Sequence, residues 1–146
     1  MSEFARTFPN LSSEDFRKLE GTMGMALPED LRRHYESFNG GTPKKNTFIA
    51  DDEYRIKEFL PILYGAKGAC LEDAYVDLVL NNKSFPKDVI PFASDGGGDY
   101  FCYCLSAERR GEVFFYQSDY YDDPARAVVW LAPTFNAFMK ALVLPT

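Results

Sequence analysis

The second half of the chain carries four short runs that are rich in valine, isoleucine, phenylalanine and tyrosine. They span residues 89–92, 100–105, 111–117 and 127–131. Short runs of these residues, separated by turn-forming residues, are typical of strands that follow one another in a sheet. We therefore predict an antiparallel meander over residues 89–131.

Helical spacing of apolar residues occurs in four places around this region. Serine and threonine are preferred helix caps, and proline is favoured in the first turn of a helix. The predicted helices begin after Ser12, at Pro28, at Leu71 and after Thr134. Gly21 and Gly24 are expected to interrupt the first, residues 39–41 to end the second, and the third runs to Leu80. Two further strands are expected at 47–50 and from Tyr54, with residues 51–53 as the turn between them.

The order of these elements separates helices from strands, which is typical of the α+β class. We expect an α+β fold with a mainly antiparallel sheet of about five to six strands and with helices packed on it. The chain has 146 residues, 46% of them apolar, and it contains no internal repeat or long linker. These features predict a single domain that spans residues 1–146.

Charge and cysteine content indicate which partners and which cellular compartment this chain is suited to. The net charge is -6 and the pI is about 4.8, which disfavours binding to a phosphate backbone. The chain has no signal-peptide pattern, no run of 18 apolar residues and an odd number of cysteines, three. We expect a cytoplasmic monomer or weak dimer that binds neither nucleic acid nor membrane and keeps its thiols reduced.

Cysteine and histidine offer little chemistry in this sequence. Cys102 and Cys104 could form a three-sulfur metal site with Cys70, but the chain has no CxxC pair, and buried apolar cysteines are favoured. His34 is the only histidine and is predicted to lie on or near the surface of the second helix. No nucleophile motif accompanies it, so no metal site and no catalytic residue is predicted.

The glycine-rich stretch 94–99 allows close approach of a ligand to the backbone, and its aspartates could bind a cation. A phosphate-binding loop needs a helix after its glycines, whereas a strand is predicted here, so a turn is favoured over a small-ligand site. Asp95, Asp99 and Glu112 could form an acid–base pair, but solvated charges are favoured. No cofactor is expected.

Residues 115–124 mix aromatic side chains with three aspartates in a segment that is predicted to be largely a loop. Tyrosine provides a large, rigid contact area with a polar tip, and clustered carboxylates attract lysine and arginine. The segment therefore resembles a region that binds a protein. Buried tyrosines are the equally weighted alternative.

The ordered motifs together resemble the SUKH superfamily, whose founding members are fungal cell-wall-synthesis regulators of the Smi/Knr type. The resemblance spans nearly the whole chain. Its motifs are Glu20 before Gly24, Leu27-Pro28, Asn39-Gly40-Gly41, Val89–Ala93 leading into Asp95–Asp99, Gly111-Glu112-Val113, and Trp130-Leu131-Ala132 before the last helix. The chain departs from similar sequences at Gln117-Ser118-Asp119, where they often carry a histidine.

The resemblance implies an α+β fold and a non-enzymatic role, because many bacterial members are similar to immunity proteins that neutralise a toxin, often a nuclease. Fungal members instead resemble intracellular adaptors. The leading hypothesis is an immunity protein that binds a basic toxin domain; the alternatives are a regulatory adaptor, a small-ligand protein or a carboxylate-based enzyme. The predicted contacts are Asp95, Asp99, Tyr116, Asp119, Tyr120, Tyr121, Asp122 and Asp123.

Overall fold

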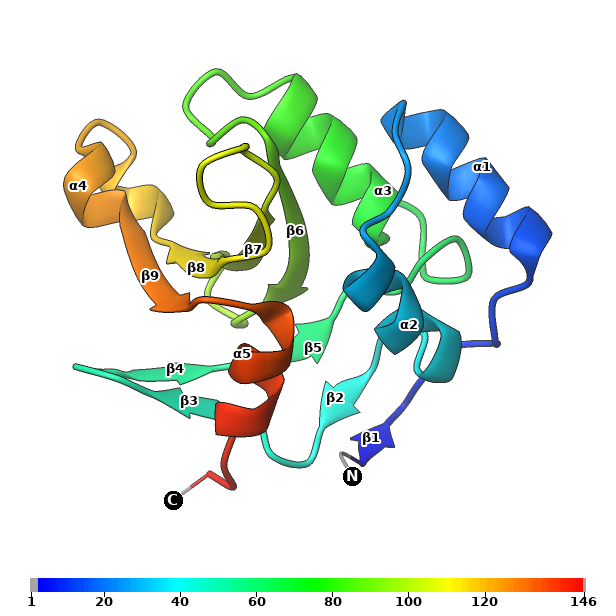
Figure 1. Cartoon of the computed structure of the whole chain (residues 1–146), viewed down its shortest axis with the longest axis horizontal. Coiled ribbons are helices and arrows are strands. Elements are labelled where there is room, and N and C mark those ends of the chain that lie inside the picture. Colours follow the sequence, from blue (N-terminus) through cyan, green and yellow to red (C-terminus); the bar gives the residue numbers. More distant parts are fainter. Residues whose placement is uncertain (1–2, 146) are drawn as a thin grey trace.

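A computed structural model describes residues 3–145 of the chain (Figure 1). The strands are β1 (Phe4–Ala5), β2 (Thr42–Pro43), β3 (Thr47–Ile49), β4 (Glu53–Arg55), β5 (Glu58–Phe59), β6 (Val89–Ser94), β7 (Tyr100–Cys104), β8 (Val113–Tyr116) and β9 (Val128–Ala132). The helices are α1 (Ser13–Met23), α2 (Glu29–Ser37), α3 (Leu71–Ala74), the π-helix η1 (Tyr75–Leu80), the 3-10 helix η2 (Ser118–Tyr120), α4 (Pro124–Ala127) and α5 (Phe135–Ala141).

The main sheet is antiparallel and has the order β5-β6-β7-β8-β9. The predicted meander is confirmed as β6 to β9, and the fold is α+β as the order of elements predicts. The two strands predicted near residues 47 and 54 are confirmed as the hairpin β3–β4. This hairpin forms a separate two-stranded sheet, so the main sheet has five strands.

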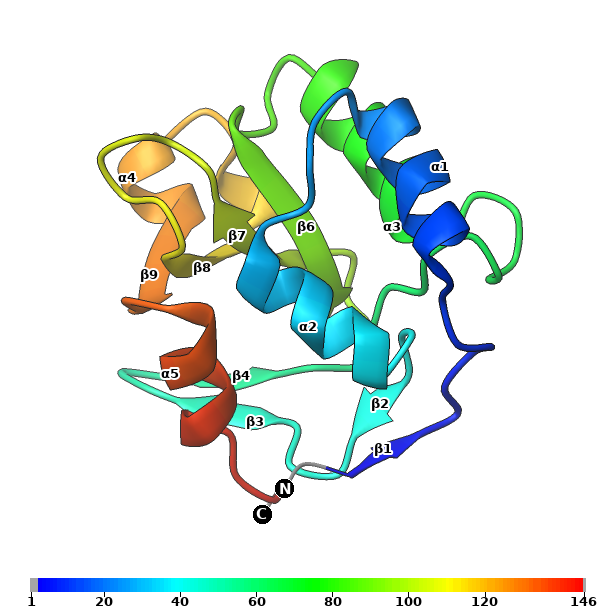
Figure 2. The same ribbon diagram turned by 45° about the vertical axis from the view of Figure 1, so that its right-hand side comes forward.

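Both faces of the main sheet are covered, which explains why its strands are almost continuously apolar rather than alternating. On one face, the ring of Phe92 lies 5.4 Å from that of Phe135 in α5, and the Tyr103 hydroxyl donates to Asp30 of α2 at 2.8 Å. On the other face, Tyr116 packs 4.8 Å from Phe85, which follows η1. Figure 2 shows α2 crossing in front of β6, with α3 beside α1.

The helix starts agree with the local signals. Ser12 and Asp15 form a capping box at the start of α1, and the Thr134 hydroxyl accepts from the Ala137 backbone N–H at the start of α5. The prediction that Gly21 interrupts the first helix is wrong, because α1 continues through Gly21; it ends before Gly24, as predicted, and the φ of Gly24 is 77°. The helix predicted from Leu71 to Leu80 is present, but its second half is η1, in which the Asn81 N–H donates to the Val76 carbonyl five residues earlier.

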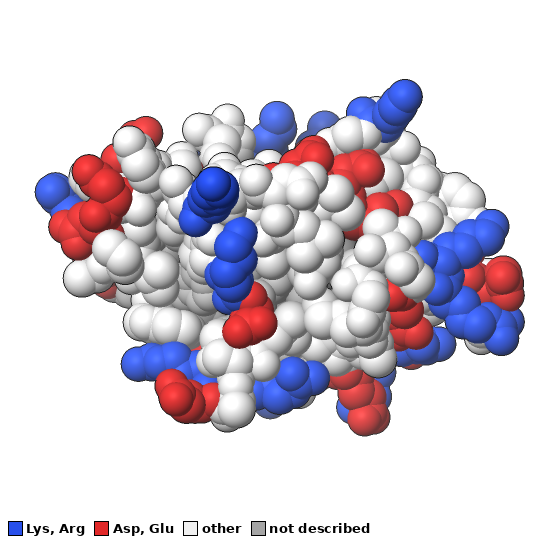
Figure 3. All heavy atoms as spheres, turned by 90° about the horizontal axis from the view of Figure 1, so that it is seen from above, with Lys and Arg blue, Asp and Glu red and all other residues white. Residues whose placement is uncertain are grey.

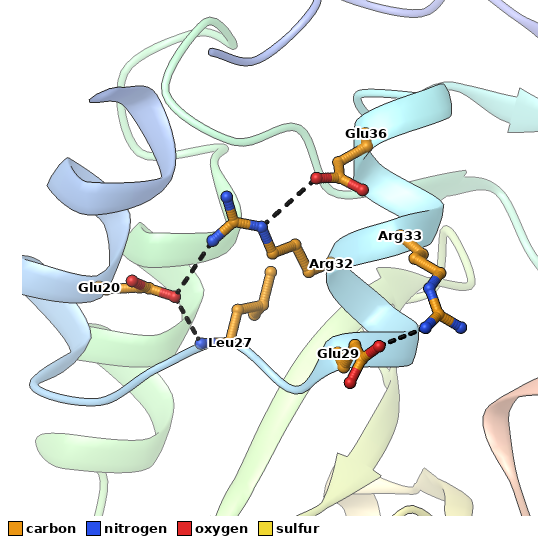
Figure 4. A network of polar contacts seen from close by, with 6 residues as sticks. All are labelled: Glu20, Leu27, Glu29, Arg32, Arg33 and Glu36. Atoms are coloured by element: carbon orange, nitrogen blue, oxygen red, sulfur yellow. Dashed lines mark hydrogen bonds and ion pairs between the residues drawn. The ribbon is translucent and has the colours of Figure 1, made fainter. Parts of the chain in front are cut away.

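Figure 4 shows how side chains hold the connection between α1 and α2. A Glu20 oxygen accepts from the Leu27 backbone N–H at 2.9 Å and lies 3.9 Å from the Arg32 guanidinium. Arg32 in turn pairs with Glu36 on its own helix and lies 4.4 Å from the centre of the Phe16 ring. Glu20, one of the residues on which the family resemblance was based, therefore orients α2 against α1 rather than facing a ligand.

Candidate functional site

The glycine-rich stretch forms the turn between β6 and β7, as predicted. One oxygen of Asp95 accepts from the backbone N–H groups of Gly97 at 2.8 Å and Asp99 at 3.0 Å. The Asp95 carboxylate thus closes the turn on itself. In this way a residue predicted to contact a partner also determines the shape of the loop that presents it.

Asp99 joins this turn to the aromatic-acidic segment. One oxygen of its carboxylate accepts from the Ser118 backbone N–H at 3.0 Å and from the Ser118 hydroxyl at 2.6 Å. Hydrogen bonds to a carboxylate are about twice as strong as those between neutral groups. The structure therefore brings together the two segments that the sequence analysis selected separately.

The segment after β8 is not simply a loop, because it contains η2 and α4. Asp119, Asp122 and Asp123 are exposed there, and Tyr121 is 59% exposed. Tyr120 is half-buried beneath Arg126, whose guanidinium lies 4.2 Å from the centre of the ring. Figure 3 shows acidic side chains gathered, with a basic one beside them, at the left-hand end of the molecule, where Figure 1 places α4.

Tyr116 requires a correction to the predicted contact set. Its side chain is only 4% exposed, and its hydroxyl donates to the Ser84 carbonyl at 3.0 Å. Tyr116 is therefore a buried tyrosine, as the alternative interpretation expected, whereas Tyr121 is exposed. The ring of Tyr116 lines a hollow below the surface instead of pointing outward.

That hollow has a volume of about 240 Å³ and is called here the tyrosine hollow. Its lining includes Leu78, Phe85, Gly98, Tyr100, Tyr116 and Tyr121. Burial, followed by the charges of Cys102, Asp77 and Asp95, raises the pKa of Tyr100. Burial and then Asp99 raise the pKa of Tyr116. Both phenols thus stay neutral over a wide pH range, and the O–H of Tyr116 is already used in its hydrogen bond to the Ser84 carbonyl.

Sequence reasoning missed Leu78, Phe85 and Tyr100 as part of this site. Leu78 lies in η1 and Phe85 in the following loop, far in sequence from Tyr121. Only the position of Tyr100 directly after Asp99 could have indicated its place in the hollow. The arrangement offers aromatic faces beside carboxylates, which suits a cationic or apolar side chain of a partner.

The other candidate chemical groups lie elsewhere or are engaged. Glu112 lies at the far end of the β7–β8 hairpin, where it pairs with Arg109 at 2.9 Å, so it does not join Asp95 and Asp99. All three cysteines are free thiols with buried side chains, and burial raises the pKa of Cys102 well above its ordinary value. Within residues 3–145, no three His, Cys, Asp or Glu side chains are placed to share a metal ion.

His34 is half-buried and lines a hollow near the surface, in line with the prediction, but its ring is more enclosed than the helical pattern indicated. Its Nε2 atom is buried and has no hydrogen-bond partner within the described part of the chain. Burial lowers the pKa of His34 from 6.5 to about 4. The helical pattern places His34 beside the core-facing Tyr35, but it could not show that rings from other elements enclose its Nε2 atom. The rings around it belong to Phe4, Tyr35, Phe38, Phe59 and Phe135.

This burial predicts a pH-dependent stability. As the pH falls below 6.5, His34 binds a proton in the unfolded state but not in the folded state. Proton binding therefore favours unfolding. The contribution of His34 to stability is thus complete above pH 6.5 and is lost toward pH 4. Between pH 7 and pH 5, the free energy of unfolding should fall by about 2 kcal/mol less in His34→Phe than in the unaltered chain. Urea unfolding at both pH values measures this, and equal losses would contradict it.

No helix within residues 3–145 is both long and apolar enough to cross a membrane.

Comparison with known proteins agrees with the motifs described above. The model of the SMI1 / KNR4 family (SUKH-1) matches residues 10–141. No curated protein matches the chain significantly. The family match covers most of the 146 residues and includes α1 to α5, the main sheet and the site. The chain therefore belongs to the SMI1 / KNR4 family (SUKH-1).

Proposed function

We propose that this chain is a non-enzymatic immunity protein that binds and neutralises a basic toxin domain. One observation carries the proposal: the hydrogen bonds between Asp99 and Ser118 unite the glycine-rich turn and the aromatic-acidic segment into a single surface. This surface, called here the acidic face, comprises Asp95, Asp99, Asp119, Tyr121, Asp122 and Asp123.

The acidic face suits a partner that binds nucleic acid. A nuclease carries a basic groove for its substrate, and carboxylates on a rigid support can cover such a groove. Charges at the edge of an interface mainly speed up association, because they steer the partner before contact. The exposed ring of Tyr121 adds contact area at low conformational cost.

The gene neighbourhood provides the first test. We expect the DNA immediately upstream to encode a large secreted protein with a short toxin domain at its C-terminus. Co-expression of that domain with this chain should restore growth, and omission of the chain should not. Neighbours without a toxin would instead favour the intracellular adaptor.

Neutralising the acidic face tests the site itself. The triple change Asp119→Asn, Asp122→Asn and Asp123→Asn should lower the on-rate for the toxin domain roughly tenfold at low ionic strength. The same change should flatten the dependence of the on-rate on salt, since fewer charges then steer association. Stopped-flow measurements over a salt series would show both effects.

The chain offers a matched control for this change. Asp51 and Asp52 lie in the exposed turn of the β3–β4 hairpin, and the exposed Glu53 begins β4, so their replacement by Asn, Asn and Gln removes the same charge elsewhere. This control should keep most of the on-rate. If both variants slow association equally, the net charge of the chain determines the rate and the assignment to the acidic face fails.

A further inference from the structure

A second hollow adjoins the tyrosine hollow. It has a volume of about 360 Å³, and its lining includes Glu58, Leu60, Cys70, Asp77, Leu78 and Tyr100. Leu78 and Tyr100 also line the tyrosine hollow. Because they share these two residues, the hollows lie next to each other, and together we call them the two-part groove.

The groove differs in charge from other hollows of the described chain. No lysine, arginine or histidine lines either part, whereas Glu58 and Asp77 line the second. By contrast, Arg33 and His34 line a third hollow, and Arg6 and Lys57 line a fourth. Lys87, on the loop after η1, is engaged by the carbonyls of Val79 and Asn82 at 2.6 and 2.8 Å. The groove thus suits a cation better than either of these two hollows does.

The two carboxylates are also uncommitted. Within residues 3–145, neither Glu58 nor Asp77 makes a side-chain hydrogen bond or an ion pair. By contrast, Asp95 accepts from backbone N–H groups of its own turn, and Asp99 accepts from Ser118. Asp77 is exposed and Glu58 is half-buried. A guanidinium group placed between them could therefore pair without displacing any existing contact.

We propose that the two-part groove receives a short extended segment of the partner protein. An arginine of that segment lies between Glu58 and Asp77, and an apolar side chain two residues away enters the tyrosine hollow. Side chains two residues apart point to the same side of an extended chain, so both anchors can enter adjoining hollows. This inference rests on the proposed function only in taking the partner to be a protein.

A short peptide tests the groove without the toxin. The probe is acetyl-Gly-Arg-Gly-Phe-Gly-amide, and the matched control carries citrulline, which is nearly isosteric with arginine but neutral. We expect the arginine peptide to shift the backbone amide resonances of η1 and of the β6–β7 turn. Replacing arginine by citrulline should weaken binding roughly tenfold, because a charge-assisted pair is lost. Resonance shifts confined to other surfaces would overturn the proposal.

Variants of the chain test each half of the groove. Glu58→Gln with Asp77→Asn should weaken the arginine peptide about tenfold and leave the citrulline peptide unchanged. Asp51→Asn with Glu53→Gln, which removes the same charge from the β3–β4 hairpin, should affect neither peptide. Tyr121→Ala should weaken binding of the peptide that carries phenylalanine more than binding of a control peptide in which alanine replaces that phenylalanine. Equal affinity for all variants would overturn the proposal.

The outcomes separate this inference from the proposed function. If the toxin is neutralised equally well by the Glu58→Gln, Asp77→Asn chain and the peptide does not bind, the groove inference fails and the immunity function stands. If the peptide binds in the groove but no toxin partner exists, the groove inference stands and the immunity function fails.

Discussion

Replacing Asn39 with alanine is expected to lower the free energy of unfolding by about 4 kcal/mol and the melting temperature by roughly 10 °C. Asn39 is 1% exposed at the end of α2. Its amide nitrogen donates to the carbonyls of Pro9 at 2.9 Å and Ile62 at 3.1 Å, and its amide oxygen accepts from the Ile62 N–H at 2.7 Å. One side chain thus joins three segments that are distant in the sequence.

The large effect follows from what the substitution leaves behind. Ile62 is completely buried, so its N–H would be left without a partner where water cannot replace it, while its carbonyl would keep only the Tyr64 N–H. Asn136→Ala is the matched control, because Asn136 lies exposed on α5; it should change stability by no more than about 0.5 kcal/mol. Urea unfolding of both variants measures the difference. Equal midpoints would show that Asn39 does not hold these segments together.

Replacing Gly40 with alanine is the second change expected to have a large effect, a loss of about 3 kcal/mol. Gly40 has a φ of 74°, a conformation that costs other residues roughly 1 kcal/mol or more. A Cβ atom there would also lie 2.9 Å from Cα and 3.1 Å from N of Pro61, which is buried. Because backbone atoms cannot rotate away, the neighbouring segment would have to shift.

A variant at Gly24 separates the cost of the positive φ from the cost of the close approach to Pro61. Its φ of 77° nearly equals that of Gly40, but no atom lies within 4 Å of a Cβ placed on it. Gly24→Ala should therefore cost only the conformational penalty, about 1 kcal/mol. The difference between the two alanine variants, measured by thermal unfolding, reports the close approach to Pro61. Equal losses would mean that the Pro61 segment adjusts freely.

Local signals in the sequence were sufficient for most secondary structure. Ser12 and Thr134 cap α1 and α5 as predicted, since a cap depends on atoms within three residues. The meander was predictable because short apolar runs between turns identify strands without knowledge of their neighbours. The same reasoning missed β1, β2 and β5, each only two residues long and each defined by a pairing partner distant in the sequence.

The candidate site was only partly predictable. The sequence identified the glycine-rich turn and the aromatic-acidic segment, but not the contact between Asp99 and Ser118, which lie 19 residues apart. It could not distinguish Tyr116 from Tyr121, because the exposure of a tyrosine after a strand depends on what packs against it. Phe85 and the loop after η1 bury Tyr116 and leave Tyr121 open.

The sequence by itself determined the α+β class, the order of the elements and the family, because these depend on local spacing and on motifs in a fixed order. Tertiary structure alone decided that the Nε2 atom of His34 is buried, that Asn39 joins distant segments and that Leu78 and Tyr100 line two hollows. Each of these features requires side chains from several elements to come together. Such contacts form only when the whole core packs, and no local pattern of residues encodes them.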